Sequence, residues 1–370
     1  MRLLLAFLLV ASTAQAERAR DLGVPFEGTP GKLNAITDVP GVEVGQATLI
    51  QGDNVRTGVT MVFPRGRANP EAVYGGFFDL NGNGEMTGLS YLQDFGVVQG
   101  PIGITNTNAI GDVYAGIQRW TQTKFGEATW PVVAETWDGV LNDLGGFHVT
   151  PETAIAAIEA AKPGAIEEGN VGGGTGMVCF GFKGGIGTAS RIAHAGNRPY
   201  TVGVLVQCNT GDRKVLRIAG APVGAELARR YLPCEAGKCA TEPPPDQGSI
   251  IIVVATDAPL IPKQLDRIAK RAAMGLARLG SYSGDESGDL IVAVSNGTPN
   301  ANHPDQKAPS PIPLIASRDL DPLFEATVEA TEEAIVNALV AARTMTGIAG
   351  ARVTALPHDE LKRILKKYRR

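Results

Sequence analysis

Short apolar runs recur along the chain and predict buried β-strands. They are Val59–Phe63, Gly176–Phe182, Tyr200–Cys208, Ile250–Thr256 and Leu290–Ser295. Several of these runs are apolar at every position rather than at alternate positions, which is typical of strands that are covered on both faces. The pattern therefore predicts a sheet that lies between other layers of structure.

Apolar residues at helical spacing predict helices between and after these strands. Thr150 and Pro151 begin one that runs to Ala161, because Thr is a good N-cap and Pro suits the first helical position. Further helices are expected at Pro222–Tyr231, Pro262–Leu279, Pro322–Thr344 and His358–Tyr368. The longest of these should place its apolar stripe on one face and its acidic residues opposite. Interspersed strands and helices indicate a layered α/β fold, and the sequence contains no internal repeat.

The N-terminus has the three parts of an export signal. Arg2 precedes an apolar stretch, Leu3–Ala11, and Ala14-Gln15-Ala16 follows as an A-x-A cleavage site. The apolar stretch is shorter than the about 20 residues needed to span a bilayer. Residues 1–16 are therefore predicted to be a signal peptide, and residues 17–370 a single exported domain, periplasmic or secreted and not associated with a membrane.

The composition gives no support for nucleic-acid binding. The formal net charge is −4, with 44% hydrophobic and 19% charged residues, whereas nucleic-acid binding calls for a basic face. Cys179 and Cys208 lie in apolar, strand-like surroundings and are expected to be buried thiols. Cys234 and Cys239 flank a turn, where an oxidising compartment permits a disulfide; a metal pair is the weaker alternative, because no further ligands complete a zinc set.

Two glycine-rich segments resemble ligand loops only in part. Asp79–Gly84 begins like a calcium loop, but Ser90 stands where the twelfth position needs a Glu, so a glycine-rich turn is expected. Val171–Arg191 matches neither phosphate-binding glycine motif, which favours tight turns where backbones pack closely. The four histidines show no metal-ligand spacing, and neither G-x-S-x-G nor S-x-x-K occurs. No metal or cofactor is therefore implied.

Gly248 and Ser249 join a proline-rich loop to a strongly apolar strand. Serine is a poor nucleophile until a base accepts its proton. Attack of the Ser249 hydroxyl on the Gly248 carbonyl would break the chain and expose an α-amine, whose pKa of about 7.7–8.0 makes it a usable base. Glycine would leave that carbonyl unhindered. A Gly-Ser pair is common, however, and Gly280-Ser281 is another in this chain.

Longer motifs give this pair a context. PVVAETWDGVLND, GNVGGGTGM, FKGGIGTASR, YTVGVLVQCNTGDR and GSIIIVVATDAPL occur in order. This set resembles the self-processing aminopeptidases, a DmpA-like family that includes L-aminopeptidase/D-esterase and the β-peptidyl aminopeptidases. The resemblance extends over nearly all of the mature chain. It implies a four-layer αββα sandwich, similar in layering to N-terminal nucleophile hydrolases and to ornithine acetyltransferases, and self-cleavage into residues 17–248 and 249–370.

The resemblance also implies roles for particular residues. Ser249 matches the nucleophile and Asn209 the side-chain amide of the oxyanion hole. Ser287 matches a hydroxyl that contacts the nucleophile, with Asp289 as the acid behind it, where some relatives carry Glu. Glu135 matches a carboxylate near the free amine of the substrate, and Trp137 is a candidate for shaping that pocket. Four of these residues also have a structural interpretation: Glu135 as a helix-start acid, Asn209 as a cap of the following turn, and Ser287 and Asp289 as turn residues.

The expected function is hydrolysis of N-terminal α- or β-aminoacyl residues from short peptides, amides or esters through an acyl-enzyme. Relatives form homo-oligomers, so a tetramer of processed heterodimers is expected. Two alternatives remain. One is an acyltransferase of the ornithine acetyltransferase type, which normally uses Thr where this chain has Ser249. The other is an inactive periplasmic binding protein, which would not need the five site residues. The choice between α- and β-amino substrates stays open.

Overall fold

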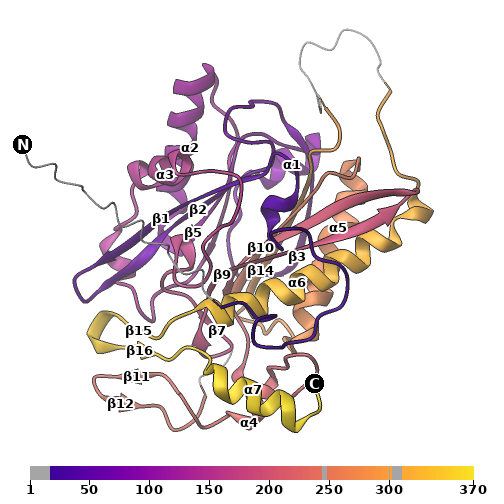
Figure 1. Ribbon diagram of the computed structural model, residues 1–370. Helices are drawn as coiled ribbons and strands as arrows, with labels where there is room; N and C mark the ends of the chain where they lie inside the picture. Colours follow the sequence, from indigo (N-terminus) through magenta and orange to yellow (C-terminus); the bar gives the residue numbers. More distant parts are fainter. Residues whose placement is uncertain (1–16, 244–247, 300, 302–310) are drawn as a thin grey trace, which may run out of the picture.

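Two β-sheets stacked face to face form the centre of the protein (Figure 1). The computed structural model describes residues 17–243, 248–299, 301 and 311–370, so the predicted signal peptide and part of the proline-rich loop lie outside the described residues. The larger sheet has the strand order β4 (Val97–Val98), β3 (Val73–Gly82), β14 (Gly288–Ser295), β13 (Ser249–Thr256), β10 (Arg198–Asn209) and β9 (Gly185–Ala195). The smaller has the order β1 (Glu43–Gln51), β2 (Val55–Phe63), β5 (Ile102–Asn106) and β6 (Val132–Thr136).

Helices cover both outer faces of this pair of sheets (Figure 1). The long helices α5 (Pro262–Arg278) and α6 (Asp321–Ala341) pack on the six-stranded sheet, and α2 (Ile110–Phe125) and α3 (Pro151–Glu159) pack on the four-stranded sheet. The result is the expected αββα sandwich. No helix among the described residues is long and apolar enough to cross a membrane.

The continuous apolar runs follow from this layering. In β13, Ile250 and Ile252 belong to the core beneath α5 and α6. Ile251 and Val253 alternate with them and belong to the core between the two sheets. Because alternate side chains of a strand point to opposite faces, a central strand with two covered faces has no position left for a polar residue.

Several predicted elements need correction. The helix expected at Pro222–Tyr231 is reduced to α4 (Val223–Glu226). The strand expected at Gly176–Phe182 is a tight hairpin of β7 (Val178–Cys179) and β8 (Phe182–Lys183), because Phe180 and Gly181 take positive φ values of 47° and 67°. The turn expected at Asp79–Gly84 is wrong in its first part, since β3 continues to Gly82. The helices α3, α5, α6 and α7 (His358–Lys367) lie where predicted.

The acidic side of α6, opposite the apolar stripe, is partly buried. Glu333 is fully buried and accepts hydrogen bonds from Arg20 Nε at 2.7 Å and Arg191 Nη2 at 2.7 Å. Burial raises the pKa of Glu333, but its hydrogen bond to Arg20 and the charges of Arg191 and Arg20 outweigh this and hold the pKa below its ordinary value. The network ties the N-terminal segment to α6.

Glu333→Gln is therefore expected to destabilise the fold strongly. Removing one partner of a buried ion network leaves uncompensated charge and costs about 3–5 kcal/mol. The measurement is the midpoint of thermal unfolding. Glu152→Gln is the matched control: its ion pair with Arg119 is exposed, at 73% and 60% of the two side chains, and should be nearly neutral. Equal midpoints for the two variants would contradict the network's importance.

The described cysteines form two disulfides. Cys179 and Cys208 were expected to be buried thiols, and that expectation is wrong: β7 lies against β10, their Cα atoms are 5.5 Å apart and the sulfurs are bonded. Cys234 and Cys239 are also bonded to each other. The second bridge closes the hairpin of β11 (Cys234–Glu235) and β12 (Lys238–Cys239), which forms a small sheet with β16 (Arg352–Val353) and β15 (Met345–Thr346).

Candidate active site

Three strand ends meet at one edge of the six-stranded sheet. Strand β10 ends at Asn209, β13 begins at Ser249 and β14 begins at Gly288. In the strand register Asn209 pairs with Ser249, and Ser249 pairs with Gly288. Neighbouring strands lie about 4.8 Å apart. Sheet pairing therefore brings Asn209, Ser249 and the start of β14 side by side, although they come from distant parts of the sequence.

The Ser249 hydroxyl is buried and held by backbone. The Gly288 N–H donates to Ser249 Oγ at 3.2 Å, and Ser249 is 6% exposed. The preceding residue, Gly248, packs directly against strand β10. A Cβ added there would lie 1.8 Å from the Asn209 carbonyl oxygen, so position 248 has no room for a side chain.

The side-chain amide of Asn209 is fixed in one orientation. Its Oδ1 accepts from the Val178 N–H at 2.7 Å, and its Nδ2 donates to the Trp137 carbonyl at 2.9 Å. An amide NH₂ has two hydrogens, and only one is used by Trp137. Because Asn209 pairs with Ser249 in the sheet, this amide lies beside the serine.

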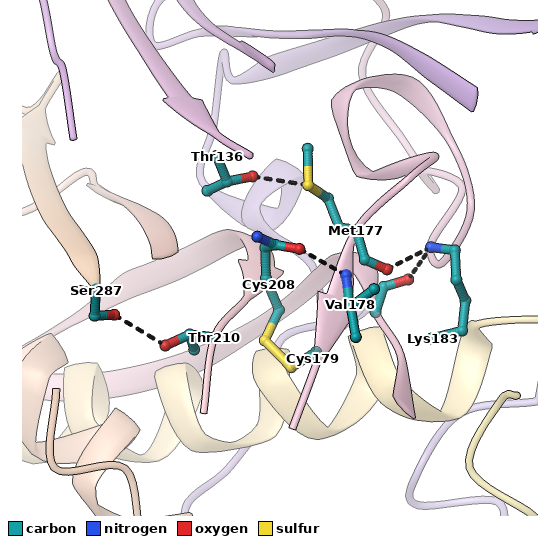
Figure 2. The surroundings of a disulfide bond; sticks show 10 residues. Thr136, Met177, Val178, Cys179, Lys183, Cys208, Thr210 and Ser287 are labelled. Carbon is teal, nitrogen blue, oxygen red and sulfur yellow. Dashed lines mark hydrogen bonds between the residues drawn. A yellow bond between two sulfur atoms is a disulfide. The ribbon is translucent and has the colours of Figure 1, made fainter. Parts of the chain in front are cut away.

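Ser287 and Asp289 form a buried hydroxyl–carboxylate pair. Ser287 Oγ donates to Asp289 Oδ1 at 2.7 Å, as their alternate spacing predicts, and both residues are fully buried. On its other side Ser287 Oγ lies 3.3 Å from Thr210 Oγ1 (Figure 2). Within the described residues the Ser287 hydroxyl forms its hydrogen bonds with these two partners. The hydrogen bond to Ser249 Oγ comes instead from the N–H of the next residue, Gly288.

Glu135 lies at the end of β6 on the neighbouring sheet and is 4% exposed. Its two carboxylate oxygens accept from the Thr107 hydroxyl and from the Glu85 N–H. Burial raises the pKa of Glu135, and these two hydrogen bonds offset part of that rise. A Cβ built on Gly84 would lie 3.1 Å from Glu135 Oε1 and 3.4 Å from Gly288 Cα, which places the carboxylate near the backbone that contacts Ser249.

Trp137 lies two residues after Glu135, just beyond the end of β6. Its side chain is exposed, at 42%, whereas its carbonyl is occupied by Asn209. Sequence reasoning did not select Thr107 and Thr210, although each directly follows a strand that ends at the site. It also did not select the buried Asp138 and Lys183. Position after a strand is a signal that could have found the two threonines.

The site contains the groups that acyl transfer requires. A buried hydroxyl stands beside an amide donor, and a buried carboxylate lies nearby that can pair with a cationic amine. Among the described residues no cluster of three or more His, Cys, Asp or Glu could hold a metal. Together with the αββα layering, these groups fit a serine hydrolase whose fold resembles that of the N-terminal nucleophile hydrolases.

The match of residues 34–353 to peptidase family S58 specifies the class further, and the chain belongs to that family. It is 51% identical to a β-peptidyl aminopeptidase, BapA, of Sphingosinicella microcystinivorans, over 99% of this chain and 97% of the relative. A BapA of Sphingosinicella xenopeptidilytica is 47% identical, over 98% and 95% of the two chains. The chain is thus an aminopeptidase, a hydrolase that acts on peptide or amide substrates.

Solved structures show the same fold. The L-aminopeptidase D-Ala-esterase/amidase of Ochrobactrum anthropi, described as a variant of the Ntn hydrolase fold, aligns with a TM-score of 0.87 and 42% identity, over 95% of this chain and 99% of the other. A β-aminopeptidase of Burkholderia sp. aligns with a TM-score of 0.86 and 44% identity, over the same shares. The predicted family and fold are confirmed.

Proposed function

We propose that this enzyme removes N-terminal β-amino acid residues from short peptides and amides through an acyl-enzyme on Ser249. The observation that carries the proposal is that the Ser249 hydroxyl and the Asn209 amide lie on paired strands of the six-stranded sheet, with the Glu135 carboxylate of the neighbouring sheet close to the Gly288 backbone. The β-amino preference is supported by relatives named β-peptidyl aminopeptidases at 51% and 47% identity.

Activation begins with self-cleavage at Gly248–Ser249. Ser249 Oγ attacks the Gly248 carbonyl carbon, a C–O ester bond forms, the C–N bond breaks, and the hydroxyl proton ends on the released amine. Water then hydrolyses the ester and leaves a Gly248 carboxylate and a free Ser249 hydroxyl. The new α-amine serves as the base in later turnovers. Residues 17–248 and 249–370 remain one folded body.

Each site residue then has one task in turnover. Glu135 binds the ammonium of the substrate by a charge-assisted hydrogen bond. Asn209 Nδ2 donates to the oxyanion that forms when Ser249 attacks. The Ser287–Asp289 pair orients the start of β14, and with it the Gly288 N–H that holds Ser249 Oγ. Trp137 forms part of the entrance.

Substrate recognition is tested with Glu135→Gln. The variant should lower kcat/KM for β-alanyl-p-nitroanilide about ten- to a hundredfold, because a charged hydrogen bond worth about 1.5–3 kcal/mol is lost. Propionyl-p-nitroanilide, which lacks the amine, is the control substrate and should be hydrolysed poorly and equally by both enzymes. An unchanged ratio between the two substrates would contradict the role of Glu135. An L-alanyl anilide preferred over β-alanyl would contradict the β-amino assignment.

The same residue gives a pH dependence. Below its pKa the Glu135 carboxyl is neutral and cannot pair with an ammonium, and burial raises that pKa. The pH profile of kcat/KM reports groups of the free enzyme. As the pH is lowered, kcat/KM should therefore decrease at a higher pH than it would if Glu135 had the pKa of an ordinary glutamate. This decrease should be absent from the pH profile of Glu135→Gln. If kcat/KM decreased at the same acidic pH in the wild-type enzyme and in Glu135→Gln, another group would be responsible for the decrease.

Gly248→Ala tests self-cleavage. The added methyl would overlap the Asn209 carbonyl oxygen at 1.8 Å, so the scissile carbonyl must shift away from Ser249. We expect cleavage to slow at least about tenfold, since a shift of about 1 Å can cost a hundredfold. Time-resolved denaturing gels measure it. Gly237→Ala is the control, because its Cβ position is open and the residue lies in the turn between β11 and β12, although its φ of 78° brings some strain.

Export and assembly complete the proposal. The first 16 residues have the composition of a cleaved signal peptide, which would place the enzyme in the periplasm or outside the cell. Two disulfides are consistent with an oxidising compartment. Homo-oligomers of the processed heterodimer follow from the expectation for the family. Transfer of the acyl group to an added amine rather than to water would instead favour the acyltransferase alternative.

A further inference from the structure

A lysine lies fully buried beneath the glycine-rich loop. Lys183 Nζ on β8 donates to the carbonyl oxygens of Gly174, Met177 and Gly184, at 3.2, 2.8 and 2.9 Å. Figure 2 shows the bond to Met177. These three acceptors use all three N–H groups of an ammonium. Burial of a charge costs several kcal/mol unless it is compensated, and three main-chain carbonyls of one loop provide that compensation. The ammonium therefore fixes the course of this loop.

The loop presents one backbone donor to the active site. Met177, whose carbonyl binds Lys183, directly precedes Val178, whose N–H donates to Asn209 Oδ1 at 2.7 Å. The next residue, Cys179, is bonded to Cys208, the neighbour of Asn209 on β10 (Figure 2). The donor is thus held between a lysine on one side and a covalent bridge on the other.

The opposite side of the Asn209 amide is held in a similar way. Its acceptor, the Trp137 carbonyl, directly precedes Asp138, which is fully buried and whose Oδ1 accepts from Asn142 Nδ2 at 3.0 Å. Burial lowers the pKa of Lys183 to about 7, and the charge of Asp138 opposes that shift. The Asp138 carboxylate, on the segment that follows the Trp137 carbonyl, therefore favours the ammonium form of Lys183.

We propose that Lys183 is a positioning residue for the oxyanion donor: it fixes the 174–184 loop so that Val178 holds the Asn209 amide in the plane that stabilises the transition state. The inference rests on the oxyanion role proposed above for Asn209. Lys183 contacts neither Ser249 nor Glu135 in the described structure. Its loss should therefore lower kcat and leave KM nearly unchanged.

A double-mutant cycle tests this mechanism. In Lys183→Met we expect kcat, per processed Ser249 N-terminus, to fall about ten- to a hundredfold with KM within about threefold. In an Asn209→Ala background the same change should cost less than about threefold, because residues that act through one another are not additive. An equal loss in both backgrounds, or a loss in KM alone, would overturn the positioning role.

Two further variants protect the test against simple misfolding. Lys183→Gln keeps two N–H donors, so its kcat should fall less than that of Lys183→Met. This fall should also become smaller in the Asn209→Ala background. A fall in kcat that is equally large in both backgrounds would refute the inference. Ile364→Ala, in the core under α7, should lower the unfolding midpoint and leave kcat per processed site unchanged. Full kcat in Asn209→Ala would instead reject the oxyanion assignment, which separates failure of the proposed function from failure of the inference about Lys183.

Discussion

Ser249→Ala is expected to give a single unprocessed chain with at least about a 10⁴-fold lower rate of p-nitroaniline release from β-alanyl-p-nitroanilide. The change removes the oxygen that attacks in self-cleavage and in turnover, so both reactions stop together. The fold should persist, because β13 loses only one hydroxyl, which accepts a single hydrogen bond from Gly288 at 3.2 Å. Denaturing gels, N-terminal sequencing and the anilide assay measure the two losses.

The chain contains a matched control for this variant. Ser281 also follows a glycine and is buried, at 8% exposure. It lies in the turn after α5, where its hydroxyl accepts from the Ser283 N–H. Ser281→Ala should therefore be processed and active. Two chains of normal size from Ser249→Ala would refute the cleavage site, and an intact wild-type chain with full activity would refute the need for cleavage.

Asn209→Ala is expected to lower kcat about a hundred- to a thousandfold, the usual cost of removing one oxyanion donor. KM should change little, because the amide acts on charge that develops only in the transition state. Asn209→Asp should be worse, since it keeps the shape of the side chain but directs a carboxylate toward the developing oxyanion. Steady-state kinetics on processed enzyme measure both variants.

Asn296→Ala is the control variant, because it removes an asparagine side chain that forms hydrogen bonds with backbone carbonyls away from the site. It follows the far end of β14, and its side chain donates to the carbonyls of Pro40 and Pro64. Its kcat should equal that of the unmodified enzyme. If Asn209→Asp retained the activity of the unmodified enzyme, the oxygen of the intermediate would not lie beside this side chain, and another donor would be required.

The parts of the fold that sequence predicted well are those where one physical effect dominates. Strands β10, β13 and β14 are covered on both faces, so their apolar runs were unambiguous. Strand β9 was missed because it contains glycines and polar residues. Its Gly187 packs against α6 so closely that a Cβ would lie 2.0 Å from the Ala334 carbonyl oxygen. At this position the strand packs through its backbone rather than through an apolar side chain, so the sequence shows no apolar pattern there.

The site was predictable to a smaller extent. From chemistry alone the sequence could nominate only Ser249, and Asn209, Glu135, Ser287 and Asp289 depended on resemblance to a family. Sheet register brings Ser249, Asn209 and the start of β14 together, and the stacking of the two sheets brings Glu135 near them; neither is visible in a single sequence. The bridge between Cys179 and Cys208 and the burial of Lys183 were unpredictable for the same reason, since both follow from how β7 and β8 fold back against β10.

The place of β13 and β14 in the sheet bears on how the mature enzyme behaves in solution. These strands follow the proposed cut, yet they lie between β3 and β10, which precede it. All four cysteines also precede the cut, so no covalent bond would join the two fragments. To separate, they would have to break the hydrogen bonds on both sides of a central strand pair and open the main core. Dilution to nanomolar concentration should therefore leave the specific activity of each heterodimer constant.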